Sequence, residues 1–95
     1  MLRLIHSKST TMTTVDLDGK LIGPWVEEVR TTVGALSGGQ TVCLNLEHLS
    51  FADAAGVSLL YGLRRDGIQL VGASPLIGGL LQLHGQQAPM MGKNQ

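Results

Sequence analysis

Apolar and polar positions along the chain alternate with two different periods, which predict strands and helices. Near the N-terminus, Thr13, Val15 and Leu17 alternate with more polar neighbours, as in a half-buried strand. Further along, apolar residues recur every three to four positions, as on one side of a helix. The order β-β-α-β-α-β-α follows, with strands over 2–5, 11–17, 41–46 and 68–71 and helices that start at Pro24, after Asp53 and at Pro75.

Local signals predict where these elements begin and end. Pro24 and Pro75 suit the first position of a helix, where a missing N–H loses no hydrogen bond. Asp53 is expected to cap the second helix, because its carboxylate can accept from a backbone N–H two or three residues further on. We predict helix ends at Gly38-Gly39 and at Gly85, a turn over 18–20 and a loop over 47–52.

This order of elements predicts a small α/β domain with a mixed four-stranded sheet and three main helices. The first two strands are joined by a short polar segment, so they are expected to pair antiparallel. Each later strand–helix–strand step implies a parallel crossover. The predicted domain covers residues 1–85, and residues 86–95 are expected to form a flexible C-terminal tail.

Composition narrows the classes of partner. Seven Lys and Arg balance seven Asp and Glu, so the chain lacks the basic field of a nucleic-acid-binding protein, and a protein partner is favoured. No charged residue lies between Asp66 and Lys93, but glutamines, glycines and prolines interrupt that span, so no direct membrane insertion is expected. The N-terminus has too short an apolar stretch for a signal peptide, which predicts a cytoplasmic location.

Residues that perform catalysis do not gather in the sequence. His6, His48 and His84 have no spacing typical of metal ligands or of a base beside a nucleophile. Cys43 lies in an apolar strand, where the surroundings raise the thiol pKa, and a single cysteine fits a reducing compartment. We therefore predict no catalytic residue, no metal site and no cofactor.

The segment 51–57, Phe-Ala-Asp-Ala-Ala-Gly-Val, has the one shape suited to binding. It leads into a helix whose first turn carries small side chains and free backbone N–H groups. On the residues alone a structural interpretation is favoured, in which Asp53 is only a cap and Gly56 only allows close packing. The alternative is a surface that binds a protein partner through Asp53, Ala54, Ala55, Gly56 and Val57.

Four spaced segments, 17–21, 42–46, 51–56 and 68–72, together resemble the STAS domain over about residues 17–83. This is the family of anti-sigma factor antagonists and of the cytoplasmic domains of sulfate transporters. Its members typically carry Asp-Ser-Ser-Gly or Asp-Thr-Gly-Gly at the third segment, and a partner kinase phosphorylates the hydroxyl after the aspartate. This chain has Ala54 there, so the resemblance implies no phosphorylation at the family position.

The resemblance implies a non-enzymatic protein–protein interaction module, similar to an anti-sigma factor antagonist of bacterial transcription regulation. Its partner would be a kinase-like anti-sigma factor bound at the start of the second helix, without control by phosphate. The alternative is a STAS-type accessory subunit of a bacterial ABC lipid-transport complex, with a transporter ATPase as the partner. A homodimer is also left open.

Overall fold

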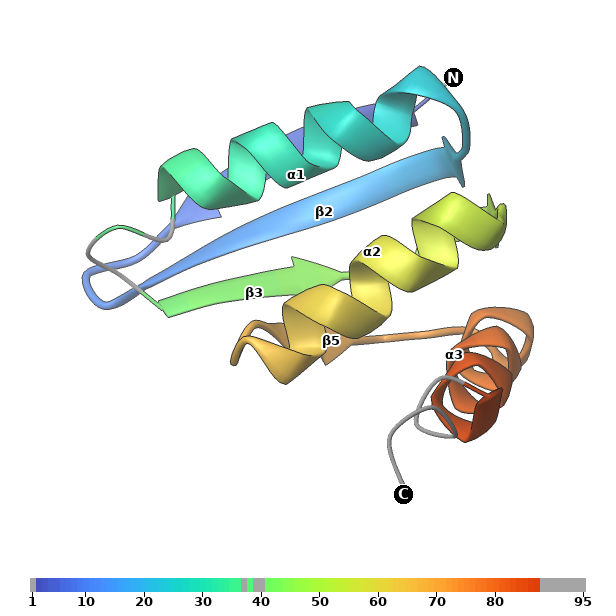
Figure 1. Cartoon of the computed structure of the whole chain (residues 1–95). Helices are drawn as coiled ribbons and strands as arrows, with labels where there is room; N and C mark the ends of the chain where they lie inside the picture. Colours follow the sequence, from blue (N-terminus) through green and yellow to red (C-terminus); the bar gives the residue numbers. More distant parts are fainter. Residues whose placement is uncertain (1, 37, 39–40, 88–95) are drawn as a thin grey trace.

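The protein is a mixed β-sheet with helices packed on one face (Figure 1). The computed structural model describes residues 2–36, 38 and 41–87. Within these ranges the elements are β1 (Leu2–Lys8), β2 (Met12–Leu21), α1 (Pro24–Leu36), β3 (Thr41–Asn45), β4 (Leu49–Ala52), α2 (Ala54–Arg65), β5 (Gln69–Val71) and α3 (Pro75–Gln87). The predicted α/β fold and the predicted helix starts are confirmed.

Strand β2 is the centre of the sheet, whose order is β1-β2-β3-β5. As predicted, β1 pairs antiparallel with β2, and Leu4 lies opposite Leu17. β3 runs parallel to β2, and β5 runs parallel to β3, so that Leu44 lies between Val15 and Leu70. These strands are parallel because the helix between each pair returns the chain to the end of the sheet at which the previous strand began.

The predicted count of four strands is wrong, because the expected loop over 47–52 contains β4. The expected turn over 18–20 is also strand, and β2 continues through it to Leu21. After a register shift between Gly19 and Lys20, this last part of β2 pairs parallel with β4, and Leu21 lies opposite Ala52. Residues of the expected loop therefore form a strand, because the extended end of β2 offers backbone groups with which they can hydrogen-bond.

Two boundaries also differ from the predictions. β1 continues to Lys8, into the expected connection, because its last residues still pair with β2. α3 continues to Gln87, so Gly85 lies inside the helix, where the Tyr61 ring would be 3.0 Å from an added Cβ. Residues 86 and 87, expected to begin the C-terminal tail over 86–95, are the last residues of α3. Gly39 and residues 88–95 lie outside the described residues, so the helix stop at Gly38-Gly39 and the rest of the tail stay predictions.

The core lies between the sheet and the helices. In β2 alternate residues are buried, whereas Thr14, Asp16 and Asp18 on the other face are partly exposed. The helices contribute residues at helical spacing, as the amphipathic pattern predicts. The core residues of the sheet and helices include Val15, Leu17, Leu21, Val29, Val33, Leu44, Leu60, Ile77 and Leu81.

Helix α3 packs against α2 and the end of β4, away from the middle of the sheet (Figure 1). Its inward side carries Ile77 and Leu81, which are buried. Near its C-terminal end the His84 ring meets the Tyr61 ring edge-on, with 5.0 Å between the ring centroids. One side of α3 therefore holds it to the rest of the domain.

Gly56 lets the first turn of α2 lie directly against the end of β2. A Cβ added at Gly56 would lie 2.6 Å from the Leu21 carbonyl oxygen and 3.0 Å from a Leu21 side-chain carbon. Backbone cannot move aside as a flexible side chain can. The approach of α2 to the sheet therefore requires glycine at this position.

We predict that Gly56→Ala lowers the free energy of unfolding by about 1–3 kcal/mol, the usual cost of overpacking a close contact. The matched control is Gly62→Ala in the same helix, where an added Cβ meets nothing within 4 Å. That variant should gain up to about 1 kcal/mol from helix propensity. Urea unfolding of both variants measures the difference, and equal stabilities would show that α2 does not depend on this contact.

Candidate functional site: a docking surface at the start of helix α2

The Asp53 carboxylate joins the starts of two helices. Oδ1 accepts a hydrogen bond from the Gly56 N–H at 2.8 Å, which confirms the predicted N-cap of α2. Oδ2 accepts from the Gly23 N–H at 3.1 Å, directly before α1. The Asp53 N–H donates to the Leu21 carbonyl at 3.1 Å, so the end of β2 is part of the same junction.

These hydrogen bonds favour the ionised form of Asp53. The bond from the Gly56 N–H, followed by the bond from the Gly23 N–H, holds the pKa of Asp53 below its ordinary value of 3.8. At neutral pH the group is therefore a carboxylate with both oxygens engaged. Its first role is to fix the direction in which α2 leaves the sheet.

The five residues of the predicted binding segment lie together but differ in exposure. Ala54 and Ala55 are exposed, and Asp53 is partly exposed. Gly56 and Val57 are buried, since both face the interior of the domain. The surface at the start of α2 is therefore formed by two methyl groups and one capped carboxylate.

An apolar groove of about 500 Å³ lies beside Ala54. It is formed by β4, the start of α2 and α3, and its lining residues are Phe51, Ala52, Asp53, Ala54, Val57, Leu76, Leu80, Leu83 and His84. Phe51, Leu76 and Leu83 are 43%, 49% and 54% exposed. Among the described residues, these are three of the five large apolar side chains that are exposed. Such clustered exposure is typical of an interaction surface.

The sequence pattern does not predict the contribution of β4 and α3 to this surface. One signal was available, because α3 carries no Asp, Glu, Lys or Arg and is rich in leucine. The pattern did not show which of its leucines face solvent. That depends on how α3 packs against α2, where His84 and Gly85 lie beside Tyr61.

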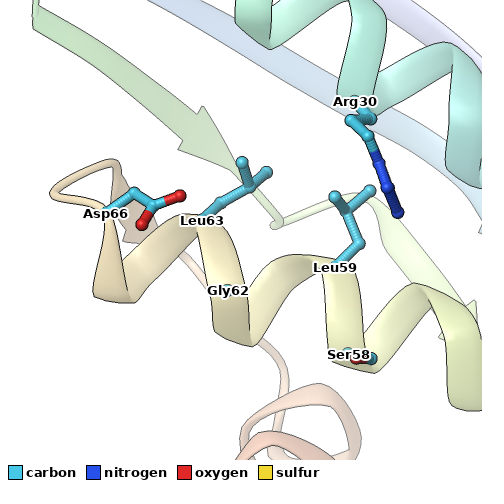
Figure 2. A pocket seen from close by; sticks show the side chains of 6 residues that line it. All are labelled: Arg30, Ser58, Leu59, Gly62, Leu63 and Asp66. Carbon is cyan, nitrogen blue, oxygen red and sulfur yellow. The ribbon is translucent and has the colours of Figure 1, made fainter.

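A second, smaller hollow of about 280 Å³ lies between α1 and α2 (Figure 2). Its lining residues are Arg30, Ser58, Leu59, Gly62, Leu63 and Asp66. Figure 2 shows Arg30 reaching from α1 toward Leu59, while Asp66 lies at the far end of α2. Arg30 Nε also lies 3.9 Å from Glu27 Oε1. The polar groups here do not converge on one point.

The histidines lie on separate elements: His6 on β1, His48 before β4 and His84 on α3. Among the described residues, no three of the His, Cys, Asp and Glu side chains are close enough to hold a metal ion. Cys43 is buried as predicted, and burial, with a smaller contribution from the Asp16 carboxylate, raises the pKa of its thiol.

In the part of the chain that the structure describes, no helix has the length and apolar character to cross a membrane.

Comparison with known proteins gives matches at the level of structure. No protein-family model matches the chain, and no curated protein sequence matches it significantly. The anti-sigma factor antagonist SpoIIAA in its unphosphorylated form superposes with a TM-score of 0.64 and 27% identity, over 87% of this chain and 83% of that one. The phosphorylated form of SpoIIAA, a Bacillus cell fate determinant, gives 0.64 and 26% identity, over 90% and 84%. An anti-sigma factor antagonist STAS domain from Rhodobacter sphaeroides gives 0.61 and 19% identity, over 78% and 92%.

The chain thus has the fold of the STAS domain. Within that class it resembles anti-sigma factor antagonists, as the four sequence segments predict. The likeness extends over most of the chain. SpoIIAA and the Rhodobacter sphaeroides domain are antagonists of anti-sigma factors, so the likeness suggests a protein-interaction role.

We predict that Asp53→Ala lowers the melting temperature by several degrees at neutral pH, because two backbone N–H groups lose their acceptor. Asp53→Asn is the matched control. Its amide oxygen can still accept from Gly56, but its NH₂ group cannot accept from Gly23, so its melting temperature should fall between the other two. Identical melting temperatures for all three proteins would contradict the role of the junction.

The same junction predicts a dependence on pH. Since folding lowers the pKa of Asp53, the carboxylate contributes stability above its unfolded pKa near 3.8, and this contribution is lost as the pH falls below that value. The advantage of the wild type over Asp53→Ala should therefore shrink on acidification through this range. Melting curves at a series of pH values measure it, and a constant difference would show that the charge is not involved.

Proposed function

We propose that this chain is a non-enzymatic protein-interaction module that resembles an anti-sigma factor antagonist and docks on its partner without control by phosphate. The surface consists of Asp53, Ala54 and Ala55 with the adjoining apolar groove, and the buried Gly56 and Val57 of the predicted segment lie behind it in the interior. One observation carries the proposal: the exposed Ala54 lines a groove together with the half-exposed Phe51, Leu76 and Leu83.

Such a surface is suited to a close protein contact. Small side chains at Ala54 and Ala55 let a partner approach the helix backbone, while the groove accepts an apolar side chain. Full burial of one exposed leucine or phenylalanine contributes about 1.5–3 kcal/mol. Phe51, Leu76 and Leu83 still expose about half of their surface, so covering all three would contribute roughly 2–4 kcal/mol in total. The Asp53 carboxylate keeps its negative charge, but backbone N–H groups already engage both of its oxygens.

The alanine at position 54 supports constitutive docking. SpoIIAA has been solved in both a phosphorylated and an unphosphorylated form. A phosphate at a helix start adds about −1.5 to −2 charge and can switch an interface, but alanine has no oxygen to receive it. We therefore place this chain in a permanently unphosphorylated state at the family position.

The same alanine also fits a second function, an accessory subunit of a bacterial ABC lipid-transport complex. Such a subunit would use the surface to bind a transporter ATPase and would need no phosphate switch. Affinity purification of the tagged chain from its native host separates the two functions. A kinase-like anti-sigma factor among the captured proteins supports the first, and a transporter ATPase supports the second.

We predict that Ala54→Arg abolishes capture of the partner, because a bulky charged side chain at the docking surface clashes with it. The melting temperature should stay near that of the wild type, because a side chain at an exposed first-turn position extends into solvent. The control is Thr31→Arg, which adds the same charge at an exposed position of α1. It should capture the partner normally. Full capture by Ala54→Arg would place the interface elsewhere, and unfolding would show that position 54 is needed for the fold.

We further predict that incubation with ATP and a kinase-type anti-sigma factor adds no phosphate to the wild-type chain at the start of α2. Ala54→Ser restores the missing hydroxyl, so this variant should gain one phosphate at position 54. Intact mass with peptide mapping measures both proteins. A phosphate on Ser50 or Ser58 of the wild type would mean that the switch is shifted and not lost.

A further inference from the structure

Helix α3 is apolar on two sides, and the domain covers only one of them. Ile77 and Leu81 face the interior, whereas Leu76 and Leu83 are about half exposed, and Leu80 is partly exposed between them. From Pro75 to Gln87 there is no Asp, Glu, Lys or Arg. A helix that is apolar around most of its circumference is typical of a helix buried on all sides. In the isolated chain the outward apolar side of α3 is therefore exposed to solvent.

A glycine on this outward side is a second, independent observation. Gly79 lies three residues after Leu76 and four before Leu83, and it is exposed. A Cβ added there would meet nothing within 4 Å, so the packing of the chain itself does not require glycine. Glycine is also among the least favourable residues inside a helix. The missing side chain at Gly79 leaves space beside the three leucines, and this space allows another helix to approach closely.

We propose that this side of α3 packs antiparallel against α3 of a second copy of the chain, across a two-fold axis. Leu76, Leu80 and Leu83 have the i, i+4, i+7 spacing of a helix–helix seam. The spacing is nearly symmetric about Leu80. An antiparallel copy therefore brings Leu80 against Leu80 and Leu76 against Leu83 of the partner, while the gap at Gly79 admits a leucine from the opposite helix.

Charge favours a second copy over a charged partner. A two-fold contact places the residues near its axis beside their own equivalents, so a charge close to Leu80 would meet a like charge. α3 avoids this, because its outward side carries no charged residue. The whole chain has no net charge either, so two copies meet without long-range repulsion.

The dimer would have a consequence for docking, and this consequence rests on the proposed function. The three leucines of the seam also line the groove beside Ala54. A second copy on α3 therefore covers part of the surface that another partner would use. Self-association and partner binding are then alternatives, and the concentration of the chain sets the balance between them.

The test is sedimentation velocity of the purified chain from low micromolar to near-millimolar concentration. The wild type should shift from monomer to dimer. Leu76→Glu and Leu83→Lys should each weaken the dimer by more than about tenfold, because each places an unpaired charge opposite a leucine. Both positions are about half exposed, so circular dichroism should show a native fold.

The double variant Leu76→Glu/Leu83→Lys tests the direction of the seam. In an antiparallel dimer each introduced glutamate faces an introduced lysine of the partner, so the double variant should dimerise better than either single variant. In a parallel pair like charges would meet, and the double variant would be the weakest. That result, or a wild type that stays monomeric at every concentration, would overturn the proposal without bearing on docking of other proteins.

Cross-linking provides a measurement that does not depend on the charge variants. Leu80→Cys lies on the proposed axis, so mild oxidation should give a disulfide-linked dimer. Leu76→Cys should give little, because its equivalent lies at the opposite end of the seam. The wild type, with buried Cys43, is the control. Equal cross-linking of the two cysteine variants would contradict the antiparallel arrangement.

Discussion

The junction between Asp53 and the end of β2 is the contact on which the rest of the structure depends. One carboxylate accepts from the N–H groups of Gly23 and Gly56, and the Leu21 carbonyl accepts from the Asp53 N–H. The end of β2 and the start of α1, which follow each other in the chain, are thereby held to the start of α2, which lies 30 residues further on. Because Gly56 lies against Leu21 without a Cβ, α2 can begin directly on the sheet.

This junction divides the first turn of α2 into an inner and an outer half. Gly56 and Val57 point into the core, and Ala54 and Ala55 point outward. Any partner at the helix start therefore meets small apolar groups, and the nearby charge is already satisfied by backbone donors. The proposed docking without a phosphate switch follows from that arrangement, since the outward position has a methyl group where a hydroxyl would be needed.

The comparison with solved structures shows that the fold is shared although most residues differ. This chain superposes on STAS-domain proteins with TM-scores of 0.61–0.64 at only 19–27% identity. Many apolar residues can fill a core of this shape, because burial and volume matter more than the exact side chain. Few residues can satisfy the backbone at the junction. The segment 51–56 is therefore more informative about the fold than the leucines and valines of the core.

Local chemistry explains what the sequence by itself determined. The cap at Asp53 and the starts at Pro24 and Pro75 involve contacts within a few residues, so the pattern was sufficient to predict them. β4 was missed because its partner, the end of β2, lies about thirty residues earlier in the chain and had been interpreted as a turn. The groove was missed for the same reason: whether Leu76 and Leu83 face solvent depends on the docking of α3 on α2. The sequence thus determined the order of the elements and the cap, whereas tertiary packing decided which side of α2 and α3 stays open, because burial depends on neighbours that are distant in the chain.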